Sequence, residues 1–80
     1  MVSHHLPLNV VPPGERVKIV SVRAGRGLSQ RLADMGLTPG TLLTVINSYG
    51  AGPVLINLRG ARLALGFGIA QKITVERKLD

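Results

Sequence analysis

Short runs of residues in this chain carry apolar side chains at every second position. Residues 54–58 show this alternation, and residues 61–65 repeat it after the link Arg59-Gly60. Side chains of alternate residues point to the same face of a strand, so each run predicts a strand with one buried face. Because the link is short and contains glycine, we expect the two strands to pair as a hairpin.

Two further strands are expected earlier in the chain. Residues 16–22 are rich in β-branched residues and follow a turn that contains proline and glycine. Their apolar side chains fall on both faces, which predicts either a bulge or a strand that is covered on both sides. The next strand is expected to run from Thr41 to Ile46 or Tyr49.

The alternating pattern returns near the end of the chain. Residues 68–72 are expected to form a single helical turn, and a last strand follows it. In that strand Ile73 and Val75 should point inward, while Thr74 and Glu76 point outward.

The segment from Leu28 to Met35 has the spacing of a short helix. Leu28, Leu32 and Met35 recur at intervals of four and three residues and therefore fall on one face. Gly36 can adopt the left-handed conformation that ends a helix, and Leu37 then folds back against Leu32. A helix of about two turns is only marginally stable by itself in water, so it must pack against a larger core.

Residues 38–40, Thr-Pro-Gly, predict a turn between this helix and the following strand. Proline presets φ, and the glycine after it accepts a positive φ. We therefore assign structural roles in turns to Gly36, Pro39, Gly40 and Gly60.

Together these elements predict a mainly β fold of about five strands, with one short helix inserted after the first strand. Short strands separated by turns favour a small, largely antiparallel β-barrel. The 80 residues suit one domain with one core, and the absence of Cys excludes disulfides and thiolate metal sites. We expect a flexible N-terminus at residues 1–5, the barrel at residues 6–77 and a C-terminal tail at residues 78–80.

The sequence contains no combination of residues that indicates an enzyme. The acidic residues lie far apart and form no acid-base pair: Glu15, Asp34, Glu76 and Asp80. Residues 25–27 lack the third glycine of a dinucleotide-binding fingerprint, and no phosphate-loop motif is present. We therefore expect no catalysis, no small-molecule substrate and no GTP binding by the chain itself.

The only imidazoles are His4 and His5, adjacent residues in the terminus that we expect to be flexible. A dedicated transition-metal site needs further ligands, so we expect neither a metal site nor a cofactor. No apolar run is long enough to span a membrane, and the first residues lack the features of a secretory signal. These observations predict a cytoplasmic protein.

The chain is strongly basic, with a net charge of +6 and a pI near 11.3. Basic residues occur around the predicted helix, at the hairpin and near the end of the chain: Arg23, Arg26, Arg31, Arg59, Arg62, Lys72, Arg77 and Lys78. This excess indicates a negatively charged partner, which could be a protein, a lipid surface or a nucleic acid. The same arginines could instead be ordinary solubilising residues, depending on how they cluster in space.

An ordered set of motifs from Leu6 to Val75 resembles the FeoA family, the small ferrous iron transport protein A of bacteria. The motifs are Pro13-Gly14-Glu15, residues 31–40 (RLADMGLTPG), Gly52-Pro53-Val54, Leu58-Arg59-Gly60, Leu63-Ala64-Leu65-Gly66, and Ala70 with Ile73 and Val75. Each motif alone is weak, but their order and spacing together are specific. One departure is Phe67, which lies between two glycines where members of the family often carry a basic residue.

The resemblance implies an SH3-like β-barrel with the helix inserted after the first strand. It also implies a cytoplasmic accessory to FeoB, the membrane transporter with a cytosolic GTP-binding domain that takes up ferrous iron. Transition metal ion binding is implied at the level of the family, without a ligand set in this sequence. A membrane would then be approached only peripherally, through the partner.

Our first hypothesis is therefore a non-enzymatic module that binds the cytosolic part of a FeoB-type transporter and modulates its assembly or activity. The candidate partner-binding residues are Arg26, Arg31, Met35, Arg59, Arg62 and Phe67. For Phe67 we weigh two alternatives, and a side chain that fills the core is favoured over an exposed anchor.

Two other hypotheses remain open. A basic SH3-like nucleic-acid-binding module fits the high pI, but only Tyr49 and Phe67 could stack on bases. The barrel is also similar to the C-terminal domain of iron-dependent repressors, although this chain has no helix-turn-helix domain. Self-association is permitted by apolar residues on both faces of the strand that begins at Thr41, namely Leu42 and Ile46 against Leu43 and Val45.

Overall fold

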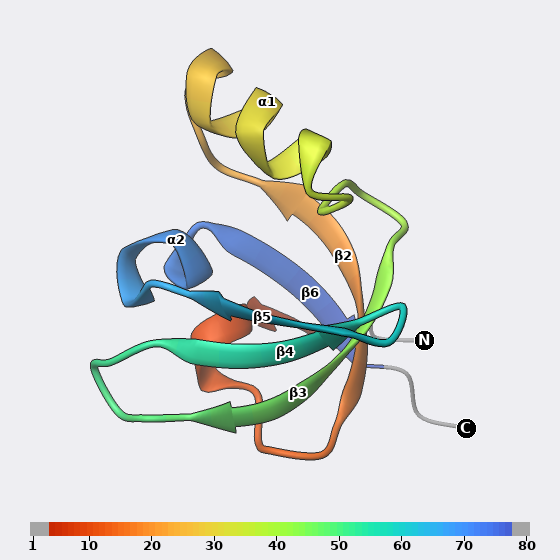
Figure 1. Cartoon of the computed structure of the whole chain (residues 1–80), viewed down its shortest axis with the longest axis vertical. Helices are drawn as coiled ribbons and strands as arrows, with labels where there is room; N and C mark the ends of the chain where they lie inside the picture. The colour runs from red at the N-terminus through yellow and green to blue at the C-terminus, as the bar shows by residue number, and fades with distance from the viewer. Residues whose placement is uncertain (1–3, 78–80) are drawn as a thin grey trace.

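The computed structural model describes residues 4–77, which form one antiparallel sheet of six strands curled around a single core (Figure 1). The strands are β1 (His5–Pro7), β2 (Arg16–Val22), β3 (Leu42–Ser48), β4 (Val54–Leu58), β5 (Ala61–Leu65) and β6 (Ile73–Arg77). Their order in the sheet is β1-β6-β2-β3-β4-β5. The helices are a 3-10 turn, η1 (Leu8–Val10), and two α-helices, α1 (Arg26–Asp34) and α2 (Phe67–Gln71). The mainly β fold with a helix inserted after residues 16–22 is thus confirmed.

β1 was not predicted from the sequence, so the sheet has six strands where about five were expected. His5, which we expected in a flexible terminus, is the first residue of β1 and lies opposite Glu76 of β6. A three-residue strand that ends in proline has no alternating pattern of its own and forms because β6 offers it a partner. The expected flexible residues 1–3 and the tail at residues 78–80 lie outside the described residues.

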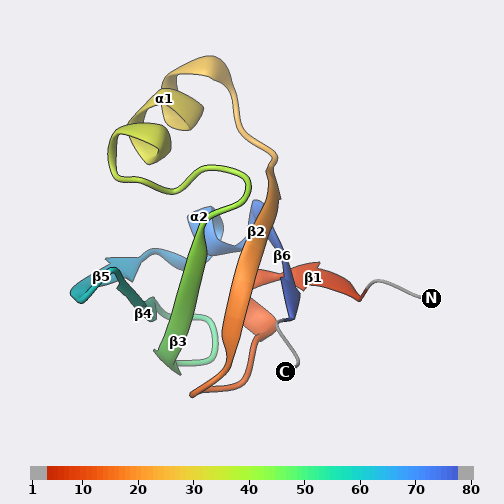
Figure 2. The same ribbon diagram turned by 90° about the vertical axis from the view of Figure 1, so that its right-hand side faces the viewer.

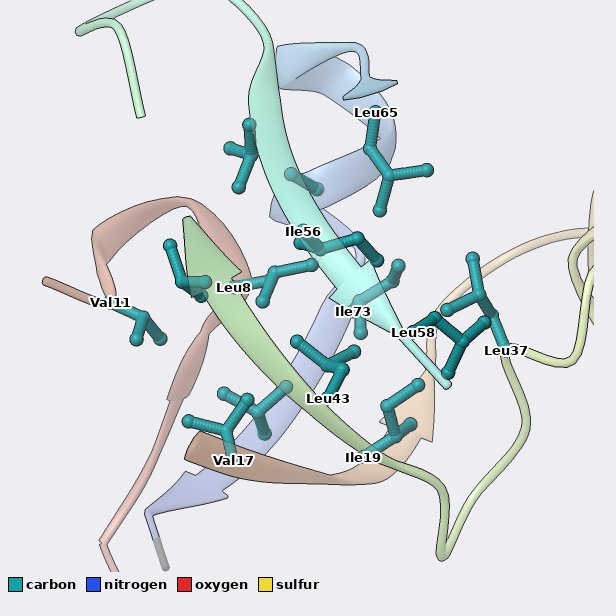
Figure 3. Close-up of a cluster of buried hydrophobic side chains, with 14 of the residues drawn as sticks. Leu8, Val11, Val17, Ile19, Leu37, Leu43, Ile56, Leu58, Leu65 and Ile73 are labelled. Carbon is teal, nitrogen blue, oxygen red and sulfur yellow. The ribbon is translucent and has the colours of Figure 1, made fainter. Parts of the chain in front are cut away.

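The core is built from aliphatic side chains, most of them on the inner faces of the strands and the rest on helices and loops (Figure 3). The buried residues are Leu8, Val11, Val17, Ile19, Leu32, Leu37, Leu43, Val45, Val54, Ile56, Leu58, Leu65, Ala70, Ile73 and Val75. Ile73 and Val75 point inward, as the alternation predicted, and so do Val54, Ile56 and Leu58 of β4. Burial of this set supplies the main free energy that stabilises so small a chain.

The two edge strands of the sheet, β1 and β5, are not hydrogen-bonded to each other. Instead η1, which follows β1, packs against α2, which follows β5. Leu8 of η1 and Ala70 of α2 both enter the core. Packing between the 3-10 turn η1 and helix α2 therefore completes the barrel in place of a last strand pairing.

The predicted bulge occurs in β2. Its register against β6 shifts between Ile19 and Ser21, so Ile19 lies opposite Val75 and Val22 lies opposite Ile73. Val17 and Ile19 are buried, and Val22 also packs against the core. The extra residue explains why apolar side chains occupy both alternations of this strand.

Helix α1 ends as the sequence predicts. Gly36 has a φ of +88°, and its N–H donates to the carbonyl of Ala33 at 2.9 Å, while the N–H of Leu37 donates to the carbonyl of Leu32 at 2.8 Å. This pair of bonds is the Schellman motif, and Leu32 and Leu37 are both buried. Met35, expected on the apolar face, is 42% exposed. The chain reverses at Gly36, so Leu37 rather than Met35 covers the core.

The turn at residues 38–41 fixes this helix end to β2. The N–H of Gly40 donates to the carbonyl of Ile19 at 2.7 Å, and the N–H of Ile19 donates to the carbonyl of Thr41 at 2.9 Å. Thr41 is buried, and its Oγ1 donates to the carbonyl of Gly36 at 3.0 Å. The predicted turn at Pro39 and Gly40 is confirmed, since Gly40 has a φ of +93° and the N–H of Thr41 donates to Thr38.

We expect Gly36→Val to destabilise the fold by more than about 1 kcal/mol, because a β-branched residue is strained at this positive φ. The measurement is urea unfolding followed by circular dichroism. Gly27→Ala is the control, since Gly27 lies inside α1 with open space where a Cβ would be, and alanine favours a helix. An unchanged unfolding free energy for Gly36→Val would contradict this account of the helix end.

We expect Thr41→Val to cost about 1–3 kcal/mol of unfolding free energy, because it leaves the carbonyl of Gly36 without its hydroxyl partner. The same unfolding measurement tests this. Thr44→Val is the matched control, because Thr44 is half-buried on the outer face of β3 and valine is a good strand former. Equal stability of the two variants would show that the Thr41 hydroxyl does not hold the turn.

Candidate partner-binding surface

The end of α1 and the β4–β5 hairpin lie together at one end of the barrel. A Cβ on Gly36 would be 3.6 Å from Cδ2 of Leu58, the last residue of β4. Leu37 and Leu58 lie next to each other in the core (Figure 3). Met35 directly precedes Gly36 and Arg59 directly follows Leu58, so both are brought to the same end of the molecule, and both are exposed.

The hairpin turn carries an arginine in an unusual conformation. Arg59 and Gly60 have φ values of +52° and +85°, as a type I′ turn requires, and Oδ1 of Asn57 accepts from the N–H of Gly60 at 2.9 Å. Arg59 is the only residue other than glycine with a positive φ in residues 4–77. Glycine or asparagine fits this position without strain, so the local conformation does not explain the presence of an arginine.

A row of polar side chains crosses four strands on the outer face of the sheet. The register places Arg16 opposite Thr44, Thr44 opposite Asn57, and Asn57 opposite Arg62. Arg16 and Arg62 at the ends of this row are exposed. Arg16 is not among the residues predicted from the sequence, because its place beside the hairpin depends on the pairing of β2 with β3 and of β3 with β4.

The carboxylates that form ion pairs lie on β6 and directly before β2, away from the β4–β5 hairpin. Arg77 donates twice to Glu15, with Nε to Oε1 at 2.7 Å and a second bond at 2.8 Å. Oε1 of Glu76 in β6 lies 3.5 Å from Nε2 of His5, and its Oε2 lies 3.9 Å from Nζ of Lys18. Within residues 4–77 no ion pair involves the arginines of α1 or of the β4–β5 hairpin. Positive charge is therefore left unneutralised on α1, on the hairpin and at Arg16.

The candidate residues do not all come together. Arg26 is the first residue of α1 and Arg31 lies in its last turn, about 7.5 Å apart along the helix axis. Phe67 lies beyond the opposite end of β5 from Arg59, near the β3–β4 loop that carries exposed Tyr49. The structure thus groups Met35, Arg59 and Arg62 with the end of α1, and separates them from Phe67.

The expectation that Phe67 fills the core is wrong. Phe67 begins α2 and is only partly buried, whereas Ala70 of the same helix is the residue that enters the core. Within α2, Ala70 is buried and Ile69 packs against the core, so the helix turns these two side chains inward rather than Phe67. Pattern alone could not show this, because it depends on how closely α2 approaches η1.

Among residues 4–77, no three His, Asp or Glu side chains are grouped as a metal site would require. Nε2 of His5 lies 3.5 Å from Oε1 of Glu76, which brings together two such side chains. In the described part of the chain, no helix is long and apolar enough to cross a membrane.

The sheet order, the inserted helix and the exposed basic hairpin define a small SH3-like barrel with a basic surface. The FeoA domain model matches residues 6–77, and the chain belongs to the FeoA family. It is 43% identical over 70 residues to a provisionally named Fe(2+) transport protein A of Methanocaldococcus jannaschii, which covers 88% of this chain and 84% of that protein.

Solved structures of the family have the same fold. A crystal structure of the iron uptake regulatory protein FeoA matches with a TM-score of 0.87 and 35% identity, covering 94% of this chain and all of that one. The solution structure of FeoA from Chlorobium tepidum matches with a TM-score of 0.82 and 29% identity, over 92% of this chain and 71% of that one. A manganese-dependent transcriptional repressor shares the fold alone, at 20% identity and over 44% of its length.

We expect Arg59→Asn to raise the unfolding free energy by about 0.5–1 kcal/mol, because asparagine tolerates the left-handed conformation better than arginine. Urea unfolding measures the change. Arg62→Asn, which makes the same substitution in the extended strand β5, should not stabilise the protein. If the two variants are equally stable, Arg59 carries no strain.

Proposed function

We propose that this protein is a non-enzymatic accessory of ferrous iron uptake that binds the cytosolic part of a FeoB-type transporter. The observation that carries the proposal is membership of the FeoA family over residues 6–77, together with a relative named as an Fe(2+) transport protein. In this proposal the binding surface comprises Met35, Arg59 and Arg62 with Arg31 of α1. The other two predicted residues lie elsewhere, Arg26 at the start of α1 and Phe67 beyond the opposite end of β5.

The exposed arginines supply the physical basis for docking. They form no ion pairs with the described carboxylates, so an acidic surface can neutralise them without first breaking a contact within this protein. The barrel presents these side chains on a hairpin and a helix end that are fixed by backbone hydrogen bonds. Binding then modulates the assembly or activity of the transporter by favouring the state that offers the better surface.

This role places the protein in the cytoplasm, and at the inner face of the membrane when it is bound to its partner. Anionic headgroups near that face would add attraction of about 1 kcal/mol for each basic residue close to the surface. Nucleic acid is a less suitable partner. The two aromatic residues lie on the order of 15 Å along β5 from the hairpin arginines, so a strand of bases could not stack beside those arginines.

We expect titration with the purified cytosolic domain of the transporter to show saturable binding at about 50 mM salt that weakens as salt is raised. Calorimetry measures the dissociation constant. Single-stranded RNA and duplex DNA of matched charge are the comparison, and both should bind more weakly than the domain. Absence of binding to the cytosolic domain at low salt would contradict the proposal, and tighter binding to nucleic acid would replace it with the alternative.

A further inference from the structure

Strand β5 forms one edge of the sheet, and its outer side has no strand partner in the described part of the chain. Leu58 and Ala61 flank the turn and form the hydrogen-bonded pair that closes it. Antiparallel pairs alternate between bonded and non-bonded, so Leu63 and Leu65 also bond to β4. The backbone N–H and C=O groups of Arg62 and Ala64 therefore point away from the sheet.

These outward-pointing N–H and C=O groups remain available for hydrogen bonds to another chain. No backbone hydrogen bond to a turn or loop and no side-chain bond within residues 4–77 involves Arg62 or Ala64. Both residues are exposed. In Figure 2, β5 lies at one side of the sheet and β1 at the other.

The opposite edge of the sheet, formed by β1, is protected from pairing with another chain. β1 has only three residues, ends in a proline that has no N–H, and continues directly into η1. β5 has five residues, no proline and one charged residue, Arg62. Exposed edges of this length pair readily with another extended chain unless they are blocked. In the described part of the chain, β5 is therefore the sheet edge that is suited to pairing with a segment of another protein.

We propose that the β5 edge receives an extended acidic segment of the cytosolic domain that is the partner under the proposed function. Backbone groups of the segment would bond to those of Arg62 and Ala64 and extend the sheet to a seventh strand. Acidic side chains on its outer face would meet Arg62, with Arg59 at the adjacent turn. Apolar side chains on its inner face would cover Leu63, which is only partly buried.

Charge decides between this occupant and a second copy of the chain. Two copies that paired through β5 would bring together two Arg62 side chains and two proteins of net charge +6. No described carboxylate lies on β4 or β5 to compensate for them. A charged residue on an edge strand discourages pairing with itself and favours a segment of opposite charge.

Two variants test the edge. Ala64→Pro removes an outward N–H and leaves the bonds between β4 and β5 in place, and Ala64→Val is its control. Arg62→Glu reverses the charge on the edge, and Arg23→Glu makes the same change on an exposed arginine outside the hairpin. We expect Ala64→Pro and Arg62→Glu to raise the dissociation constant for the cytosolic domain by about ten-fold or more, and each control by less than about three-fold.

Amide hydrogen exchange provides a readout that does not depend on a substitution. In the complex, exchange at Arg62 and Ala64 should slow by about ten-fold or more, while exchange at His5 in β1 should not change. If Ala64→Pro fails to fold, as judged by circular dichroism, Arg62→Glu and these amides decide the question.

The failures of this inference and of the proposed function are distinguishable. Wild-type binding that survives Ala64→Pro and Arg62→Glu, without slower exchange at the edge, overturns the inference and leaves the proposed function standing. No binding by the wild type removes the proposed function, and the inference with it. A wild-type dimer that Ala64→Pro converts to a monomer in sedimentation assigns the edge to a second copy, which also overturns the inference.

Discussion

The structure depends on the two hydrogen bonds that Ile19 makes with the turn after α1. The ladder between β2 and β3 pairs residues 16–18 with residues 42–44, and the bonds of Ile19 to Gly40 and Thr41 continue that ladder into the turn. The chain between Ile19 and Gly40, which includes α1, is thus inserted between adjacent strands without interrupting their pairing. Beyond Ile19, β2 pairs only with β6, and the bulge allows this change of partner.

Features with a local cause could be predicted from the sequence. The helix end at Gly36, the turn at Pro39 and Gly40, and the hairpin at Arg59 and Gly60 each depend on residues within a few positions of one another. The bulge in β2 was also indicated by the sequence, because apolar residues occupy both alternations of residues 16–22. The FeoA family was identified from the order of these same motifs, since turns that need glycine or proline restrict the sequence strongly.

Features that depend on distant pairing could not be predicted. β1 is defined only by its contact with β6, and the row from Arg16 to Arg62 exists only once the register of four strands is fixed. The burial of Met35 and Phe67 was misjudged because each adjoins a helix end, where a change of one residue moves a side chain off the core. The candidate binding surface could therefore be predicted from the sequence less completely than the fold that positions it.

The pairing of η1 with α2 has a mechanical consequence. At every other junction of the sheet, neighbouring strands share backbone hydrogen bonds, whereas at this seam only side chains hold the barrel shut. Separation of η1 from α2 would break van der Waals contacts and expose part of the aliphatic core to water. It would leave the backbone hydrogen bonds between the strands intact. The contact between η1 and α2 is therefore the place where the barrel can open without the loss of any hydrogen bond between strands.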